Sequence, residues 1–387
     1  MKVALFTDTY VPQMNGVVAY LNDAIRLLSQ SEEVVLFAPG EGRYRCERVS
    51  EKFRICWIPS SPFPFYEGYR VASMDYRRVS KLLREEKPDI VHAHAPINLG
   101  LQGILAAKRE KIPVVVTYHT HFPDYVPHLL NGRLPKVLAE ASSSTVKKMI
   151  KHIFGMADIV TAPTEELARE LRSYGLRNVV LLKNGIDFSK QACTQDEAAS
   201  FRKAWGIPPE GKVALYLGRI SFEKKLDRVL EAFKMVEKDG RYLVIVGGGP
   251  YLKRFKELAS SLGVRNAVFT GFSKKTAPAY HSADFFISAS DTETFGMTFV
   301  EGMYHGLPCI GVNRLGAKEL IKDKRNGLLV EPDDVAGLAK AMERLFEDDA
   351  LCGKLGKAAR ESALGYSITD SVEETRRLYR SLVKGRA

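Results

Sequence analysis

The sequence predicts an α/β protein made of two doubly wound domains, each with a parallel sheet covered by helices. Its length of 387 residues, 45% of them hydrophobic, exceeds one ordinary core and fits two domains. Apolar strand-like runs alternate with helix-like segments, and the alternation starts again after residue 185. Such alternation is typical of parallel sheets with helices on both faces.

The first half supplies the elements of one domain, predicted over residues 1–185. Period-2 and continuous apolar runs predict strands, and 3.6-residue periodicity predicts helices. The strands are expected at 2–7, 34–38, 90–94, 114–118, 159–162 and 179–182, and the helices at 17–30, 76–86, 99–108 and 164–173. Residues 184–188 and the polar stretch after them form the expected linker.

The second half repeats the scheme over residues 186–365. Strands are expected at 213–217, 242–246 and 267–270, with helices at 226–236 and 251–262. An amphipathic stretch over 366–387 follows, with Ile368, Val372, Leu378, Tyr379 and Leu382 on one face.

A strand-to-helix junction near residue 296 carries the strongest functional signal. An apolar strand ends at Ser288, and an apolar helix follows a short polar loop. The free amides of residues 296–298 would lie at the N-terminus of this helix, which binds phosphate readily. Glu293 and Glu301 flank these amides and suit hydroxyl groups on either side, as in a nucleotide sugar. The alternative is that Glu293 is an ordinary acid of a loop and Glu301 lies on a solvated face of the helix.

Other strand ends carry further candidates, because ligands of open parallel sheets bind beyond the carboxyl ends of the strands. Gly16, at a loop-to-helix entry, allows a close approach to phosphate or is a plain loop glycine. Arg219 and Lys224, five residues apart, can neutralise a diphosphate or form an exposed basic loop. The glycines 247–249 lack the third glycine of a dinucleotide fingerprint, which argues against a dehydrogenase.

Two His-x-His pairs, His92 with His94 and His119 with His121, raise the possibility of a zinc site. Few acids that could complete a zinc shell lie nearby in the sequence, and Asp124 is the main one. Packing or hydrogen bonding therefore remains the alternative for His92 and His94.

The spacing of Glu293 and Glu301 resembles the E-x7-E signature of retaining glycosyltransferases of the GT-B fold. The family, glycosyltransferase family 4 or group 1, includes phosphatidylinositol mannosyltransferases, sucrose synthases and diacylglycerol glucosyltransferases. Residues 218–227 resemble its G-R-x-x-x-E-K-G-x-D motif, with Lys225 at the glycine position. The resemblance covers almost the whole chain. It implies two Rossmann-like domains facing a cleft, with residues 366–387 crossing back to the first domain.

The resemblance also implies the roles of individual residues. The expected catalytic residues are His119, which would hold a sugar hydroxyl, the phosphate ligands Arg219 and Lys224, and Glu293. The expected donor-binding residues are Gly16, Gly218, Phe272, Phe295, Gly296, Met297, Thr298 and Glu301. No carboxylate is placed as a covalent nucleophile, so front-face displacement is expected, with retention and without a metal or other cofactor.

For the acceptor, residues 118–126 and the basic segment after them look most like the diacylglycerol glucosyltransferase branch. The expected acceptor or membrane-side residues are Asp124, Tyr125, Lys147, Lys148 and Lys151. A basic amphipathic helix can lie on an anionic bilayer. The implied reaction transfers a hexose, with UDP-glucose as expected donor, to a membrane lipid such as diacylglycerol. A soluble acceptor and a zinc-dependent hydrolase remain as alternatives.

Composition limits the partners and the location. The net charge of +11 and pI near 9.2 favour a negatively charged partner, but no nucleic-acid-binding motif appears. The five cysteines are scattered, which predicts neither a disulfide framework nor a zinc knuckle. The expected location is cytoplasmic, peripheral on the inner face of the cell membrane. The sequence leaves the oligomeric state open.

Overall fold

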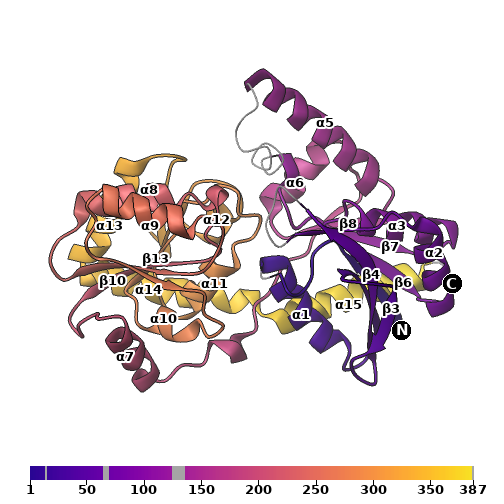
Figure 1. The fold of residues 1–387 in the computed structure, drawn as a ribbon, viewed down its shortest axis with the longest axis horizontal. Coiled ribbons are helices and arrows are strands. Elements are labelled where there is room, and N and C mark those ends of the chain that lie inside the picture. Colours follow the sequence, from indigo (N-terminus) through magenta and orange to yellow (C-terminus); the bar gives the residue numbers. More distant parts are fainter. Residues whose placement is uncertain (14, 64–68, 124–135, 386–387) are drawn as a thin grey trace. The chain divides into compact units, whose positions relative to one another are not determined.

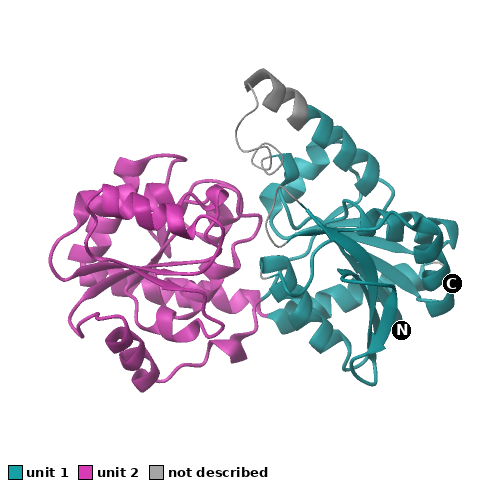
Figure 2. Cartoon of the chain, in the orientation of Figure 1, with its two compact units in different colours: residues 1–185, 368–387 teal, residues 186–367 magenta. Residues whose placement is uncertain are grey.

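The computed structural model describes residues 1–13, 15–63, 69–123 and 136–385, except for the side chains of 136–143. The chain divides into two compact units (Figure 2). Unit 1 comprises Met1–Gly185 and Ile368–Ala387, and unit 2 comprises Ile186–Ser367.

Unit 1 is built on a sheet with the strand order β3-β4-β2-β1-β6-β7-β8-β9, and β5 pairs with β4. The pairs are parallel except β3–β4 and β4–β5. The strands are β1 (Lys2–Thr7), β2 (Glu33–Gly40), β3 (Arg45–Arg48), β4 (Phe53–Pro62), β5 (Arg70–Ala72), β6 (Ile90–His94), β7 (Val114–Thr117), β8 (Ile159–Ala162) and β9 (Val179–Leu181). The helices are α1 (Gly16–Leu28), α2 (Tyr76–Glu86), α3 (Leu99–Arg109), α5 (Lys136–Phe154), α6 (Glu165–Ser173) and α15 (Ile368–Lys384).

The C-terminal helix α15 belongs to unit 1 and packs beside α1 (Figure 1). Its buried face carries Tyr379, whose hydroxyl lies 2.6 Å from Nδ1 of His92. Arg376 pairs with the buried Glu32 at 3.0 Å and also donates to the carbonyl of Leu27. A buried carboxylate with a guanidinium partner avoids the cost of an unpaired charge, so this pair ties the two ends of the chain together.

Unit 2 has a fully parallel sheet with the order β12-β11-β10-β13-β14-β15. Its strands are β10 (Lys212–Leu217), β11 (Arg241–Val246), β12 (Ala267–Gly271), β13 (Phe285–Ile287), β14 (Cys309–Val312) and β15 (Gly327–Val330). Its helices are α7 (Gln195–Ala204), α8 (Leu226–Val236), α9 (Leu252–Ser261), α10 (Ala277–His281), α11 (Met297–Tyr304), α12 (Leu315–Leu320), α13 (Val335–Glu347) and α14 (Asp349–Ala363). Short 3₁₀ turns lie at η1 (Phe188–Gln191), η2 (Phe222–Lys224) and η3 (Leu364–Tyr366). Apolar clusters cover both faces of the sheet.

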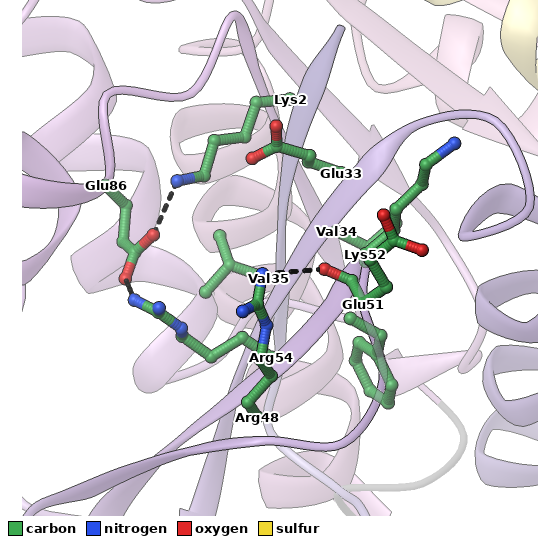
Figure 3. A pocket seen from close by; sticks show the side chains of 10 residues that line it. Lys2, Glu33, Val34, Val35, Arg48, Glu51, Lys52, Arg54 and Glu86 are labelled. Atoms are coloured by element: carbon green, nitrogen blue, oxygen red, sulfur yellow. Dashed lines mark hydrogen bonds and ion pairs between the residues drawn. The ribbon is translucent and has the colours of Figure 1, made fainter.

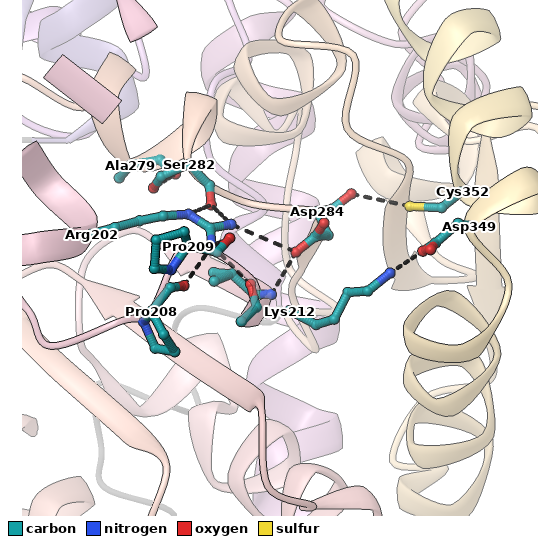
Figure 4. Close-up of polar contacts among 11 residues, drawn as sticks. Arg202, Pro208, Pro209, Lys212, Ala279, Ser282, Asp284, Asp349 and Cys352 are labelled. Atoms are coloured by element: carbon teal, nitrogen blue, oxygen red, sulfur yellow. Dashed lines mark hydrogen bonds and ion pairs between the residues drawn. The ribbon is translucent and has the colours of Figure 1, made fainter. Parts of the chain in front are cut away.

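A polar cluster fastens α7 to the sheet of unit 2 (Figure 4). Arg202 donates to the carbonyls of Ser282, Pro208 and Gly211 and lies 3.9 Å from Asp284. Asp284 in turn accepts from the amide of Val213 at the start of β10. One guanidinium therefore satisfies several backbone oxygens of otherwise irregular chain.

At the amino ends of the strands of unit 1, charged side chains line a small hollow of about 50 Å³ (Figure 3). Glu86 accepts from Lys2 at 2.6 Å and from Arg54 at 2.8 Å. The hollow has room for a water or two rather than a sugar, and it lies at the opposite ends of the strands from the candidate residues.

One part of unit 1 differs from expectation. The region of β3, β4 and β5 contains strands that the sequence did not predict, and Cys46 and Cys56 form a disulfide although their spacing indicated none. The two cysteines are direct partners in the antiparallel register of β3 and β4. The disulfide forms because this strand pairing places two cysteines that are ten residues apart in the chain opposite one another.

Candidate active site

Several predicted site residues follow the carboxyl ends of strands: His119 follows β7 in unit 1, and Gly218, Arg219, Lys224 and Glu293 follow β10 and β13 in unit 2. They lie close to the switch point of their sheet, where the strand order reverses. This switch point lies between β1 and β6 in unit 1 and between β10 and β13 in unit 2. Loops that leave two such strands diverge to opposite sides and open a place for a ligand.

The loop after β10 carries Gly218, Arg219 and Lys224 and is supported by the glycine run after β11. A Cβ atom at Gly247 would lie 1.9 Å from the carbonyl oxygen of Gly218, and one at Gly249 would lie 2.3 Å from that of Ile220. Only glycine allows this approach. The glycine run thus packs directly beneath the loop that carries Arg219.

The loop after β13 leads into α11 as the sequence predicted. Gly296 is the N-cap residue with φ +88°, a conformation that favours glycine. The amides of Met297 and Thr298, the first two residues of α11, precede the first intrahelical hydrogen bond, which the amide of Phe299 donates to the carbonyl of Gly296 at 3.0 Å. Together with the partial positive charge of the helix terminus, they can receive an anion.

The two signature carboxylates have defined partners. Glu293 Oε1 lies 2.6 Å from Nζ of Lys224, which joins the two switch-point loops. Glu301 Oε2 accepts from the hydroxyl of the fully buried Tyr280 at 2.8 Å. Burial and the neighbouring Glu301 raise the pKa of Tyr280 well above its ordinary value, so Tyr280 remains a donor. Both carboxylates are half-buried and oriented, unlike a solvated helix face.

Lys225, at the position where the family has glycine, takes a different set of partners. Its Nζ lies 2.7 Å from Asp291 and 3.0 Å from Asp333. The sequence favoured Lys224 over Lys225 as the lysine that contacts phosphate. Lys224 pairs with Glu293, the first glutamate of the E-x7-E signature. Lys225 pairs with two aspartates that are not part of the signature.

Two aromatic candidates in unit 2 have opposite environments. Phe272, after β12, is 56% exposed and therefore can stack on a flat ligand. Phe295 is 3% exposed and its ring packs edge-on against Tyr366 at 5.6 Å. Only the backbone of Phe295 is placed to contact a ligand.

In unit 1, the first strand ends in a carboxylate that the sequence reasoning passed over. The buried Asp8 accepts from the amides of Ile97, Asn98, Leu99 and Gly100 at 2.7–3.2 Å. Burial raises the pKa of Asp8, and these hydrogen bonds oppose that effect. Asp8 thus caps α3 from the end of β1 and fixes the switch point. Gly16 is the exposed first residue of α1, with Asn15 as its cap.

The strand-end histidines of unit 1 form a buried, neutral chain. His94 Nδ1 lies 2.8 Å from His119 Nε2, and the two rings stack. Both ring nitrogens of His92 are engaged, with Tyr379 and with Thr117 at 2.6 Å each. Burial lowers the pKa of His119 to about 3, and burial with the nearby His119 does the same for His92. His119 therefore acts as a neutral hydrogen-bonding group near pH 7.

These contacts bear on the zinc alternative. His121 lies 2.9 Å from Glu170, a separate pair from the His94–His119 contact. Within the described parts of the chain, no group of three or more His, Cys, Asp or Glu side chains could hold a metal ion. In the described structure the histidines of both pairs make hydrogen bonds to other side chains.

The acceptor-side candidates are only partly described. Asp124 and Tyr125 lie outside the described residues. Lys147, Lys148 and Lys151 are exposed on α5. Lys147 lies over the ring of Tyr174 at 5.6 Å, and Lys151 folds over Gly175, where a Cβ would be 2.7 Å from its Nζ.

A cavity of about 270 Å³ opens in unit 1 beside the loop after β1. Tyr10 and Trp57 line it, with ring centroids 5.9 Å apart, and Arg70 lines it with a guanidinium held by Glu41 and Ser60. The sequence offered no signal for this cavity, because β3, β4 and β5 were not predicted.

Comparison with known proteins decides the family. Residues 14–190 match the model described as Glycosyltransferase Family 4, and residues 197–362 match Glycosyl transferases group 1. An alpha-monoglucosyldiacylglycerol synthase of Streptococcus pneumoniae is 35% identical over 351 residues, covering 87% of this chain and 77% of the relative. The chain belongs to glycosyltransferase family 4. A second relative of this transferase, the GDP-mannose-dependent alpha-mannosyltransferase of Mycobacterium tuberculosis, is 29% identical and covers 95% of the chain and 93% of the relative.

Solved structures confirm the GT-B fold. The transferase superposes on the Anabaena HepE protein in complex with UDP and glucose with a TM-score of 0.78 at 18% identity, covering 98% and 99% of the two chains. For the sucrose-phosphate synthase of Thermosynechococcus elongatus the TM-score is 0.80 at 18% identity, with 99% of each chain covered. The prediction of a family 4 glycosyltransferase is confirmed. No helix of the described residues has the length and hydropathy needed to cross a bilayer.

Proposed function

We propose that the transferase moves a hexose from a nucleotide diphosphate sugar, with UDP-glucose as donor, to a hydroxyl of a membrane lipid such as diacylglycerol. The proposed donor is supported above all by the Lys224–Glu293 ion pair, which lies beside the N-terminus of α11 at the switch point of unit 2. A cation, an anion-binding helix terminus and two oriented carboxylates match the charges and hydroxyls of such a donor. The name of the Streptococcus relative supports a glucosyl donor and a diacylglycerol acceptor.

The proposed roles follow from the charges. Arg219, Lys224 and the amides of residues 296–298 bind the diphosphate, and Glu301, held by Tyr280, accepts from a ribose hydroxyl. Phe272 stacks on the base, and Glu293 accepts from the donor sugar. The cations and amides carry the charge that grows on the leaving diphosphate, so the proposal includes neither a metal nor another cofactor.

The proposed chemistry retains the anomeric configuration. The bond between the sugar C1 and the diphosphate oxygen breaks, and the acceptor oxygen bonds to C1 on the same face. The acceptor proton passes to the leaving diphosphate oxygen. A neutral His119 suits this path, since it can bind a sugar hydroxyl without placing a second cation beside an oxocarbenium-like transition state.

For the acceptor we propose two contributions from unit 1. The exposed lysines of α5 attract an anionic membrane surface on the cytoplasmic side. The cavity lined by Tyr10, Trp57 and Arg70 offers aromatic rings and a fixed cation for a polar head group. A soluble sugar acceptor is the competing proposal, and it needs the cavity but not the lysines.

The first test is thermal stabilisation by a panel of nucleoside diphosphates and nucleotide sugars, in the presence of a chelator. Wild type should shift with uridine compounds, and Glu301→Ala should reduce that shift. Glu361→Ala, at an exposed glutamate of α14, is the matched control and should behave as wild type. No shift with any nucleotide would contradict the donor proposal.

The second test supplies UDP-glucose with diacylglycerol in anionic vesicles or with soluble sugars. We expect a glucolipid whose anomeric configuration, read by proton NMR, is that of the donor. Transfer to soluble sugars alone would contradict the lipid acceptor, and an inverted product would contradict the mechanism.

A further inference from the structure

Lys225 has a backbone conformation that lysine rarely adopts. It follows η2 and caps α8 with φ +47° and ψ +42°, in the left-handed region. A side chain there crowds the following carbonyl, so glycine is favoured. A lysine at this position implies that its side chain provides something that offsets the strain.

The ammonium group of Lys225 joins three segments of unit 2. Nζ contacts Asp291 in the loop after β13 and Asp333 in the turn before α13, at 2.7 and 3.0 Å. Asp333 also pairs with Arg228 at 3.4 Å, and Arg314 lies 3.8 Å from Asp291. Burial opposes the charge of Lys225, but the hydrogen bonds with the two acids raise its pKa above the ordinary value. Lys225 is therefore charged at physiological pH, as an ion-pair bridge between the two acids requires.

The neighbouring lysine makes a parallel but different contact. Lys224 pairs with Glu293 and Lys225 with Asp291, two residues earlier in the same loop. A diphosphate would compete with Glu293 for Lys224. Lys225 already has two carboxylates, so the same anion gains little from it. When Lys224 turns to phosphate, the loop of residues 291–293 keeps its anchor at Lys225.

We propose that Lys225 is a positioning residue for the donor sugar: its bridge from Asp291 to Asp333 holds Glu293 in place while Lys224 binds the diphosphate. This inference rests on the proposed function. It predicts that the bridge affects recognition of the sugar and not of the nucleotide.

The test uses the full chain with Lys225→Gly, Lys225→Arg and Asp333→Asn. Calorimetry gives the affinity for UDP and for UDP-glucose, and initial rates give kcat and KM. Lys225→Gly relieves the backbone strain and removes the bridge. We expect it to bind UDP within about twofold of wild type but UDP-glucose about tenfold more weakly, with kcat lowered about tenfold. Lys225→Arg should recover most of both losses, and Asp333→Asn should share them in part.

The matched control is Lys324→Gly, because Lys324 also has a left-handed backbone, at φ +59°, but is largely exposed and pairs only loosely with Asp323. It should keep both affinities and kcat. Hydrogen exchange without ligand should show faster exchange at residues 291–293 in Lys225→Gly and not in Lys324→Gly.

Unchanged UDP-glucose affinity and kcat in Lys225→Gly would overturn the inference, because Lys225 would then have no role in positioning the donor sugar. An equal loss for UDP and UDP-glucose would overturn it too, because Lys225 would then act on the phosphate or on the whole fold. Failure of the wild type to bind any nucleotide would overturn the proposed function, and the inference with it.

Discussion

The two units share a doubly wound parallel core but differ in the electrostatics of their strand ends. In unit 1 the switch point is followed by buried histidines that are neutral and bonded to one another. In unit 2 it is followed by half-buried lysines paired with acids across two loops. The difference shows that the same core can place either buried, uncharged side chains or half-buried ion pairs at the ends of its strands. A charged diphosphate fits the second, and a neutral hydroxyl group fits the first.

The largest effect is expected from removing a charge in unit 2. Lys224→Met should lower kcat/KM roughly 100- to 1000-fold, because a cation that meets the growing charge of the leaving group is lost. Initial rates over a range of donor concentrations measure this. Lys354→Met, at an exposed lysine of α14, is the control. A loss below fivefold would mean that Arg219 and the helix terminus suffice, and would weaken the contrast between the units.

A pH titration separates the units through their histidines. His92 and His119 in unit 1 have pKa values of about 3 when folded, and near 6.5 in the unfolded chain. As pH falls below 6.5, the unfolded state takes up protons that the folded state refuses. Stability is therefore complete above pH 6.5 and falls toward pH 3, by about 1.4 kcal/mol per pH unit for each histidine.

The two tryptophans allow each unit to be followed alone, because Trp57 lies in unit 1 and Trp205 in unit 2. In unit 2 one histidine has a lowered pKa: burial lowers the pKa of His305 to about 4. Denaturant unfolding of Trp205→Phe and Trp57→Phe variants should show a steeper loss in unit 1 between pH 6.5 and 5. Equal slopes would contradict the neutral, buried state of the unit 1 histidines.

How far the sequence predicted these features depended on whether the signal was local. The strand Lys2–Thr7 and the helices Tyr76–Glu86 and Leu226–Val236 were predicted with their observed bounds, because periodicity and flanking polar residues define them. The strand β3 was missed, since Arg45–Arg48 is an exposed edge without apolar alternation. Edge strands depend on their partner, and here that partner is β4.

The candidate residues followed the same rule. The junction at Gly296 was predicted because strand, loop and helix are consecutive in the chain. The partners of its carboxylates were not, since Tyr280 and Lys224 reach Glu301 and Glu293 only through tertiary packing. Asp8 was missed for the same reason, because the four amides it caps lie about ninety residues away. An unexplained aspartate directly after a buried strand was the one available signal.

The disulfide distinguishes the units by a smaller effect. Reduction of Cys46–Cys56 should destabilise unit 1 by about 2 to 3 kcal/mol, because it releases a short closed loop in the unfolded chain. In unit 2, Cys193, Cys309 and Cys352 are free, so reductant should leave the Trp205 transition unchanged. A Cys46→Ser variant should match reduced wild type. If reductant has no effect on the Trp57 transition, the two cysteines are not bonded in solution.

The smallest effect is expected at the exposed aromatic of unit 2. Phe272→Ala should weaken binding of UDP about fivefold, which corresponds to ~1 kcal/mol of stacking on the base. Because the side chain is more than half exposed, the substitution should not lower the unfolding midpoint of unit 2. Met235→Ala, at another exposed apolar residue of the unit, provides the comparison. Equal losses of affinity in both variants would point to general surface hydrophobicity, whereas a loss confined to Phe272 would place the base beside β12. Unit 2 would then combine charged loops for the diphosphate with an uncharged aromatic contact for the base. The electrostatic difference from unit 1 would hold for the phosphate-binding loops rather than for the whole unit.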